Sequence, residues 1–94
     1  MEFVDLRPAN DNIHKYTALF QTENGLKQVR FGAIGYDDFT ITNNLKQKKA
    51  YLARHRAREY WDDPMTPGAL SRWLLWNKPT LHASILDFKK RFSI

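Results

Sequence analysis

The lysine and arginine side chains of this sequence are concentrated in one stretch whose chemistry suits binding to anions. Of the fifteen lysine and arginine residues, six lie between Asn44 and Tyr60, where no acidic residue precedes Glu59. The whole chain carries a formal net charge of +5. A helix face that is merely solvated usually mixes charges of both signs, whereas a run of cations attracts phosphates or acidic side chains. The stretch therefore predicts an anionic partner.

Two histidine and carboxylate positions in the same stretch have a spacing that occurs in metal sites. His55 and Glu59 are four residues apart, so their side chains would be neighbours on a helix. A catalytic zinc ion needs a third protein ligand, and neither His14 nor His82 lies at a suitable spacing. The chain has no cysteine, which excludes disulfides, a thiolate nucleophile and a cysteine-bound zinc ion. We expect no metal, and histidines that are solvated or structural.

Adjacent aspartates at two places could bind Mg²⁺ or act as general acid and base. These pairs are Asp37–Asp38 and Asp62–Asp63. Both lie where turns are expected, and aspartate is common in turns because its carboxylate accepts hydrogen bonds from nearby backbone. The sequence has no phosphate-binding loop, nucleophile elbow or dinucleotide-binding motif. We therefore predict that the protein is not an enzyme and needs no cofactor.

The basic stretch predicts the longest helix of the chain, from about Asn44 to about Tyr60, capped by Thr42 or Asn43. A thin apolar stripe is expected to face the interior, and it consists of Leu45, Leu52, Ala53 and Tyr60. A second side of the helix is expected to form an outward contact surface, and it gathers Lys48, Tyr51, Arg54, His55 and Arg58.

Two further cations of this helix lie within or beside the apolar stripe. They are Lys49 and Arg56. Long basic side chains can pack their apolar stems on a surface while the charged heads reach solvent or an acidic partner. We expect these two to be structural, with Asp62 or Asp63 as acidic partners.

The most apolar stretch of the chain predicts a short helix at the centre of the core. Thr66 suits the cap of this helix and Pro67 its first position. Pro79 ends the helix near Trp76 or Asn77. Two tryptophans at helical spacing are more typical of a core than of an exposed aromatic docking patch, which is the alternative.

A homodimer is predicted from the supply of apolar side chains. The chain has three tryptophans and six phenylalanines in 94 residues, and Leu75 falls on the otherwise polar side of the central helix. Small domains often cover such surface with a second copy.

The first 41 residues predict strands and turns. Residues 1–13 suit a short strand or extended arm, and residues 14–21 and 27–33 suit two strands of a hairpin. The Asn24-Gly25 pair between them suits the centre of a tight turn. Residues 36–41 predict a turn and a third short strand.

A final helix is expected after Thr80. Its core stripe comprises Leu81, Ile85, Phe88 and Phe92. Three cations near its C-terminus either balance the helix dipole or add to the basic surface, and they are Lys89, Lys90 and Arg91.

These elements predict one domain of the α+β class over residues 1–94. An N-terminal antiparallel hairpin or small sheet, residues 1–41, packs against about three helices, and residues 42–94 are helical. The N-terminus lacks the pattern of a signal peptide, and no apolar run is long enough to cross a membrane. We expect a soluble protein with no membrane partner.

Several short motifs resemble a known protein family. They lie at residues 30–33, 35–40, 51–56, 63–66 and 71–80, the last reading SRWLLWNKPT. The chain resembles, over roughly residues 14–92, a small uncharacterised family encoded by large nucleocytoplasmic DNA viruses, the giant viruses of amoebae and algae. Pro67 stands where an alanine is expected in that family, a change that the first helical position tolerates. The resemblance implies a viral protein located in the virion, the host cytoplasm or the viral factory, and implies no catalytic residue.

Two functions fit the sequence. The first is binding of nucleic acid, DNA rather than RNA, with little sequence specificity, in genome packaging. The expected contact residues, with Tyr51 stacking on bases, are Lys46, Lys48, Tyr51, Arg54, His55, Arg58, Arg72, Lys89 and Arg91. The second is a minor capsid or structural role in which the basic helix binds an acidic viral protein.

Overall fold

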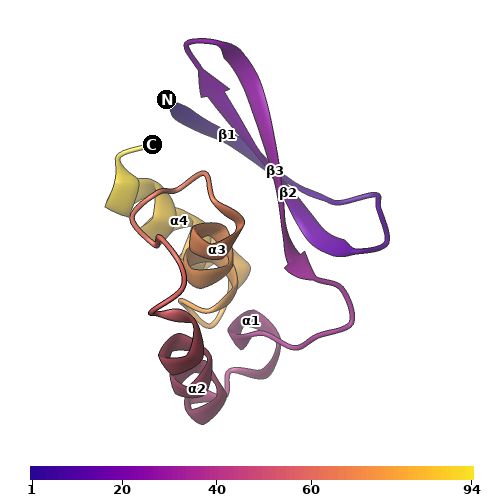
Figure 1. Ribbon diagram of the computed structural model, residues 1–94, viewed down its shortest axis with the longest axis vertical. Helices are drawn as coiled ribbons and strands as arrows, with labels where there is room; N and C mark the ends of the chain where they lie inside the picture. Colours follow the sequence, from indigo (N-terminus) through magenta and orange to yellow (C-terminus); the bar gives the residue numbers. More distant parts are fainter.

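The computed structural model describes all 94 residues and consists of a sheet followed by helices (Figure 1). The sheet is antiparallel with strand order β1-β2-β3, formed by β1 (Glu2–Pro8), β2 (His14–Thr22) and β3 (Gly25–Ala33). The helical elements are α1 (Phe39–Thr42), α2 (Leu45–His55), α3 (Pro67–Leu70), the π-helical turn η1 (Ser71–Leu75) and α4 (Leu81–Phe92). The predicted α+β class with a helical C-terminal half is confirmed.

The hairpin of β2 and β3 forms where it was predicted, with a different turn. Thr22 pairs with Gly25, so the turn is centred on Glu23 and Asn24. Within this turn Gly25 takes a positive φ, of 109°, and Asn24 does not. The expectation of Asn24-Gly25 at the turn centre is therefore off by one residue, because a glycine just after the turn already provides the backbone freedom that it needs.

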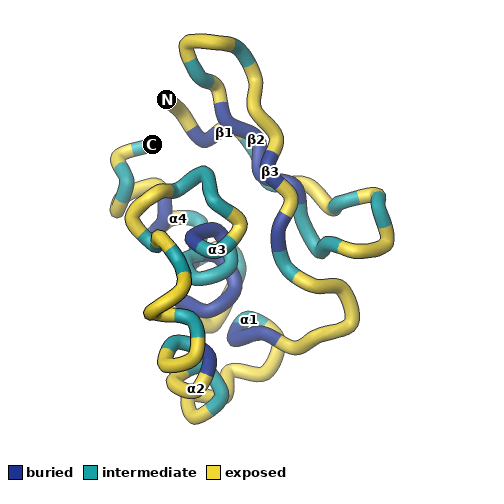
Figure 2. The backbone as a smooth tube through the Cα atoms, in the orientation of Figure 1, coloured by how far each residue is buried: buried dark blue, intermediate teal, exposed yellow.

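The core lies between the sheet and the helices. Phe20 of β2 and Phe88 of α4 are fully buried, and their ring centroids are 6.5 Å apart. Phe3 of β1 packs edge to face against both, at 5.7 Å from Phe20 and 5.5 Å from Phe88. Figure 2 shows buried segments in the strands and in α3 and α4, whereas α2 is mostly exposed. The four residues predicted as the core stripe of the final helix all pack in this core.

The predicted central helix begins as expected but changes its winding. The Thr66 hydroxyl accepts a hydrogen bond from the Ala69 N–H at 3.2 Å, and Pro67 occupies the first position. After Leu70 the helix widens, so that the Trp76 N–H donates to the Ser71 carbonyl at 3.0 Å. Trp76 is only 7 % exposed. The prediction that this helix lies in the core is confirmed, and the alternative prediction of an exposed aromatic docking patch is wrong.

Leu75 does not provide an uncovered surface for a second copy. It is 2 % exposed, and its Cδ1 lies so close to Gly32 of β3 that a Cβ at Gly32 would be 3.0 Å away. The sheet of the same chain therefore covers Leu75, because a glycine lets the two segments approach. The homodimer stays a prediction without this support, and light scattering at high protein concentration checks it.

The third short strand predicted within residues 36–41 is wrong, because these residues lead into helix α1. The Asp38 carboxylate accepts a hydrogen bond from the Thr40 N–H at 2.9 Å and caps that helix. Asn43, with a φ of 52°, ends it. A side-chain cap thus outweighs the strand propensity of the apolar residues.

Helix α2 is shorter than predicted. It is capped by Asn44, whose side chain accepts from the Gln47 N–H at 3.0 Å, and it ends at His55 rather than near Tyr60. Glu59 instead folds back, so that its carboxylate contacts His55 Nδ1 at 2.7 Å and accepts from Trp61 Nε1 at 3.1 Å. These contacts outweigh the helix propensity of the following residues.

None of the helices combines the length and the apolar composition needed to span a membrane.

Candidate functional site

Part of the side of α2 that was expected to face outward packs instead on the helical core. Tyr51 is 9 % exposed, and its ring is stacked on Trp76 at 4.3 Å and on His55 at 4.1 Å between centroids. Two parallel rings cannot share one face, so Tyr51 lies between Trp76 and His55. Burial, followed by the charge of Glu59, raises the pKa of the Tyr51 phenol above its ordinary value. The expectation that Tyr51 is free to stack on bases is therefore wrong.

Lys48 fastens α2 to the segment after η1. Its ammonium donates to the Asn77 carbonyl at 2.6 Å and lies 4.8 Å from the centroid of the Phe39 ring. Burial, and then the charges of Arg72 and Lys78, lower the pKa of Lys48. The structure gives Lys48 an internal role rather than an outward one.

Arg72 and Arg91 are engaged around one tryptophan. Their guanidinium carbons lie 4.1 Å and 3.9 Å from the Trp73 ring centroid. Arg72 also donates to the Trp76 carbonyl at 2.8 Å, and Arg91 Nε lies 3.4 Å from the Asp87 carboxylate. Burial, and then the charge of Arg91, lower the pKa of Arg72. Both side chains pack on Trp73, but Arg91 stays exposed, as Lys89 does, whereas Arg72 is partly buried.

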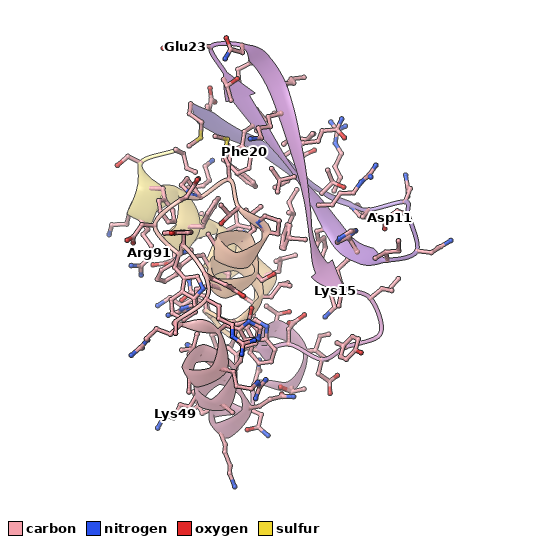
Figure 3. All side chains as sticks on the ribbon, viewed as in Figure 1. Asp11, Lys15, Phe20, Glu23, Lys49 and Arg91 are labelled. Atoms are coloured by element: carbon pink, nitrogen blue, oxygen red, sulfur yellow. The ribbon has the colours of Figure 1, made fainter.

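Five cations of α2 and the turn after it are exposed and make no ion pair, and they are Lys46, Lys49, Arg54, Arg56 and Arg58. Spacings of three and seven place Lys46, Lys49 and Arg56 on the side of α2 opposite Tyr51. We call these three the outward row, which extends over about 15 Å of helix. In Figure 3 the labelled Lys49 lies on the part of α2 remote from the sheet.

The two sides of α2 thus differ in part from the prediction: Tyr51 and Lys48 pack inward, whereas Arg54 and Arg58 are exposed as expected. Lys49 and Arg56 face solvent and make no ion pair with Asp62 or Asp63. Of the expected interior stripe, Leu45 and Tyr60 are 62 % and 82 % exposed, Ala53 is exposed and Leu52 is partly buried. Tyr51 stacks on Trp76 instead, and this contact with a distant residue decides which side of α2 faces the core.

A cleft of about 520 Å³ lies between the end of the sheet, α2 and the α3–η1 segment. A buried ion pair lines it, in which Lys15 of β2 contacts the Asp38 carboxylate at 2.6 Å. Figure 3 shows Lys15 at the end of the sheet near α1. His55 and Arg54 line the cleft from α2. Arg54 therefore belongs both to the cleft and to the exposed cations.

Sequence reasoning missed Lys15 and assigned Asp38 only to a turn. The two residues are 23 positions apart and meet because β2 begins beside α1. The only local signal is an aspartate two residues before Thr40, a helix-cap pattern. No group of three or more histidine, cysteine or acidic side chains is arranged to bind a metal ion.

The fold and the exposed cations define a small α+β protein with an antiparallel sheet and a basic helix. The chain belongs to a family of unknown function, DUF5754, whose sequence profile matches residues 4–55. The matched residues include most of β1 and all of β2, β3, α1 and α2. Comparisons with curated proteins and with solved structures found no match.

Gly68→Ala is expected to lower the free energy of unfolding by about 1 kcal/mol, although alanine normally stabilises a helix. A Cβ at Gly68 would lie 2.6 Å from Glu59 Oε2, so the carboxylate would have to leave His55 and Trp61. Chemical denaturation measures the loss, and the indole N–H resonance of Trp61 reports the displaced carboxylate. In a Glu59→Ala background the same substitution should stabilise; destabilisation there would contradict this explanation.

Proposed function

We propose that the protein binds nucleic acid, DNA in preference to RNA, through the exposed cations of α2 and with little sequence specificity. The observation that carries the proposal is the set of five exposed lysine and arginine side chains between residues 46 and 58, none of which has an acidic partner in the chain. Unpaired cations at this density attract phosphates and release counterions on contact.

The geometry of the outward row favours contacts with the backbone over reading of sequence. Lys46, Lys49 and Arg56 are long and flexible, and Ala50 and Ala53, which are also exposed, carry no hydrogen-bonding group. An α-helix fits the major groove of a DNA duplex. Contacts between these side chains and the phosphates along the groove fix the position of the helix on the duplex without specifying bases.

The experiment is a salt titration of binding to duplex DNA by the wild type and by the triple variant Lys46→Gln, Lys49→Gln, Arg56→Gln. Each lost phosphate contact reduces the magnitude of the slope of log affinity against log salt by about 0.9. The slope of the triple variant should therefore be smaller than that of the wild type by about 2.7. The matched control neutralises three exposed cations elsewhere, Lys27, Arg30 and Lys90.

Two outcomes would reject the proposal. One is the absence of wild-type binding at low salt, and the other is an equal loss of slope in the triple variant and its control. Absence of binding to DNA would favour the alternative, in which the same side chains meet an acidic protein surface in a capsid. The resemblance to a family of large DNA viruses makes genome packaging in the virion or viral factory the proposed setting.

A further inference from the structure

We propose that the cleft beside α2 receives one unpaired base of a single-stranded nucleic acid, stacked on His55, while an adjoining phosphate contacts Arg54, which lines the same cleft. This inference rests on the proposed function and names the form of nucleic acid that the site prefers. It assigns to His55 the stacking role that was first expected of Tyr51.

The cleft offers an aromatic surface at the end of an existing stack. Trp76, Tyr51 and His55 form three parallel layers, and the His55 side chain is 37 % exposed while it lines the cleft. Tyr36, which is 73 % exposed, lines the same cleft from the loop after β3. Histidine and tyrosine rings are common stacking partners of unpaired bases. The volume of about 520 Å³ is within the usual range of small-molecule sites.

The charges of the cleft favour a base over a phosphate. Its three carboxylates are Asp37, Asp38 and Glu59. Asp38 is paired with Lys15, and Glu59 with His55 and Trp61, whereas Asp37 is exposed and makes no ion pair. A free carboxylate repels phosphate but accepts a hydrogen bond from an exocyclic amine.

Cytosine and thymine test whether Asp37 accepts a hydrogen bond from the base, because cytosine carries a donor amine where thymine carries an acceptor oxygen. We therefore expect Asp37 to favour a base with an exocyclic amine. The base must also be unpaired, since a base inside a duplex is covered by its neighbours and its partner.

The experiment compares fluorescence anisotropy of labelled oligo(dC), oligo(dT) and a mixed-sequence duplex of the same length at one salt concentration. Wild type should bind oligo(dC) more tightly than oligo(dT). His55→Ala should weaken binding to oligo(dC) by about tenfold, as expected for one lost stacking contact, and leave duplex binding unchanged. His82→Ala, an exposed histidine on α4, is the matched control.

Two further variants separate stacking from a structural role of His55. His55→Phe keeps a ring but loses the contact with Glu59, so it should retain the affinity for oligo(dC) that His55→Ala loses. Asp37→Asn should reduce the preference for oligo(dC) over oligo(dT). Both variants keep the test valid if His55→Ala fails to fold.

The outcomes distinguish the two proposals. If the protein binds duplex DNA but His55→Ala and His82→Ala have the same affinity for oligo(dC), the cleft inference is overturned. The proposed function would still stand. Equal weakening of oligo(dC) and duplex binding by His55→Ala would also overturn the cleft inference. Absence of binding to every nucleic acid would reject the proposed function, and the inference with it.

Discussion

Phe88→Ala is expected to lower the free energy of unfolding by about 4 kcal/mol, the largest effect of any substitution considered for this protein. Phe88 is fully buried, and its ring lies 5.5 Å from Phe3, 6.5 Å from Phe20 and 5.3 Å from Phe92 between centroids. Alanine would leave a cavity between the sheet and α4 and would remove three edge-to-face contacts. Urea denaturation followed by tryptophan fluorescence measures the loss.

Leu86→Ala is the control for Phe88→Ala on the same helix. Leu86 is 57 % exposed, so its truncation should change the free energy of unfolding by no more than about 0.5 kcal/mol. A similar loss for both variants would mean that α4 does not join the sheet through Phe88.

Asp38→Ala is expected to lower the free energy of unfolding by about 3 kcal/mol. The Asp38 side chain is 3 % exposed, and it both caps α1 and pairs with Lys15, whose side chain is 14 % exposed. Removal of the carboxylate leaves a mostly buried ammonium without a partner and α1 without its cap. Thermal and chemical denaturation measure the combined loss.

Asp38→Asn separates the two roles of Asp38. Asparagine caps helices about as well as aspartate, so this variant should keep α1 and lose only the ion pair with Lys15. Asp37→Ala is the neighbouring control, because Asp37 is exposed and should cost less than about 0.5 kcal/mol. If Asp38→Ala were no more destabilising than Asp37→Ala, the ion pair would not contribute to stability.

Much of the fold could be predicted because its signals are local. Thr66 followed by Pro67 marks the start of the central helix, and alternation along β3 buries Phe31 while Arg30 stays exposed. The core stripe of α4 repeats at helical spacing over one element. In each case the side chains that determine a helix or a strand lie within that element or next to it in the sequence.

The orientation of α2 could not be predicted because it depends on a distant partner. Within α2 itself, Leu45 and Leu52 are the obvious interior residues, and Tyr51 is one aromatic ring among cations. The ring becomes the buried contact because Trp76, 25 positions later in the numbering, lies against it. The cleft depends on distant pairing too, since Lys15 and Asp38 come from a strand and a helix cap.

The widened turn of η1 has a consequence for how this chain tolerates changes of length. Compared with an α-helical turn, the bond from the Trp76 N–H to the Ser71 carbonyl spans one more residue. Deletion of a single residue between 71 and 75 would convert the widened turn to an ordinary α-helical turn and leave the residues beyond it in nearly the same orientation. The tryptophan at position 76 would then still face Tyr51, so the chain could lose one residue in this turn and keep the contact that holds the basic helix.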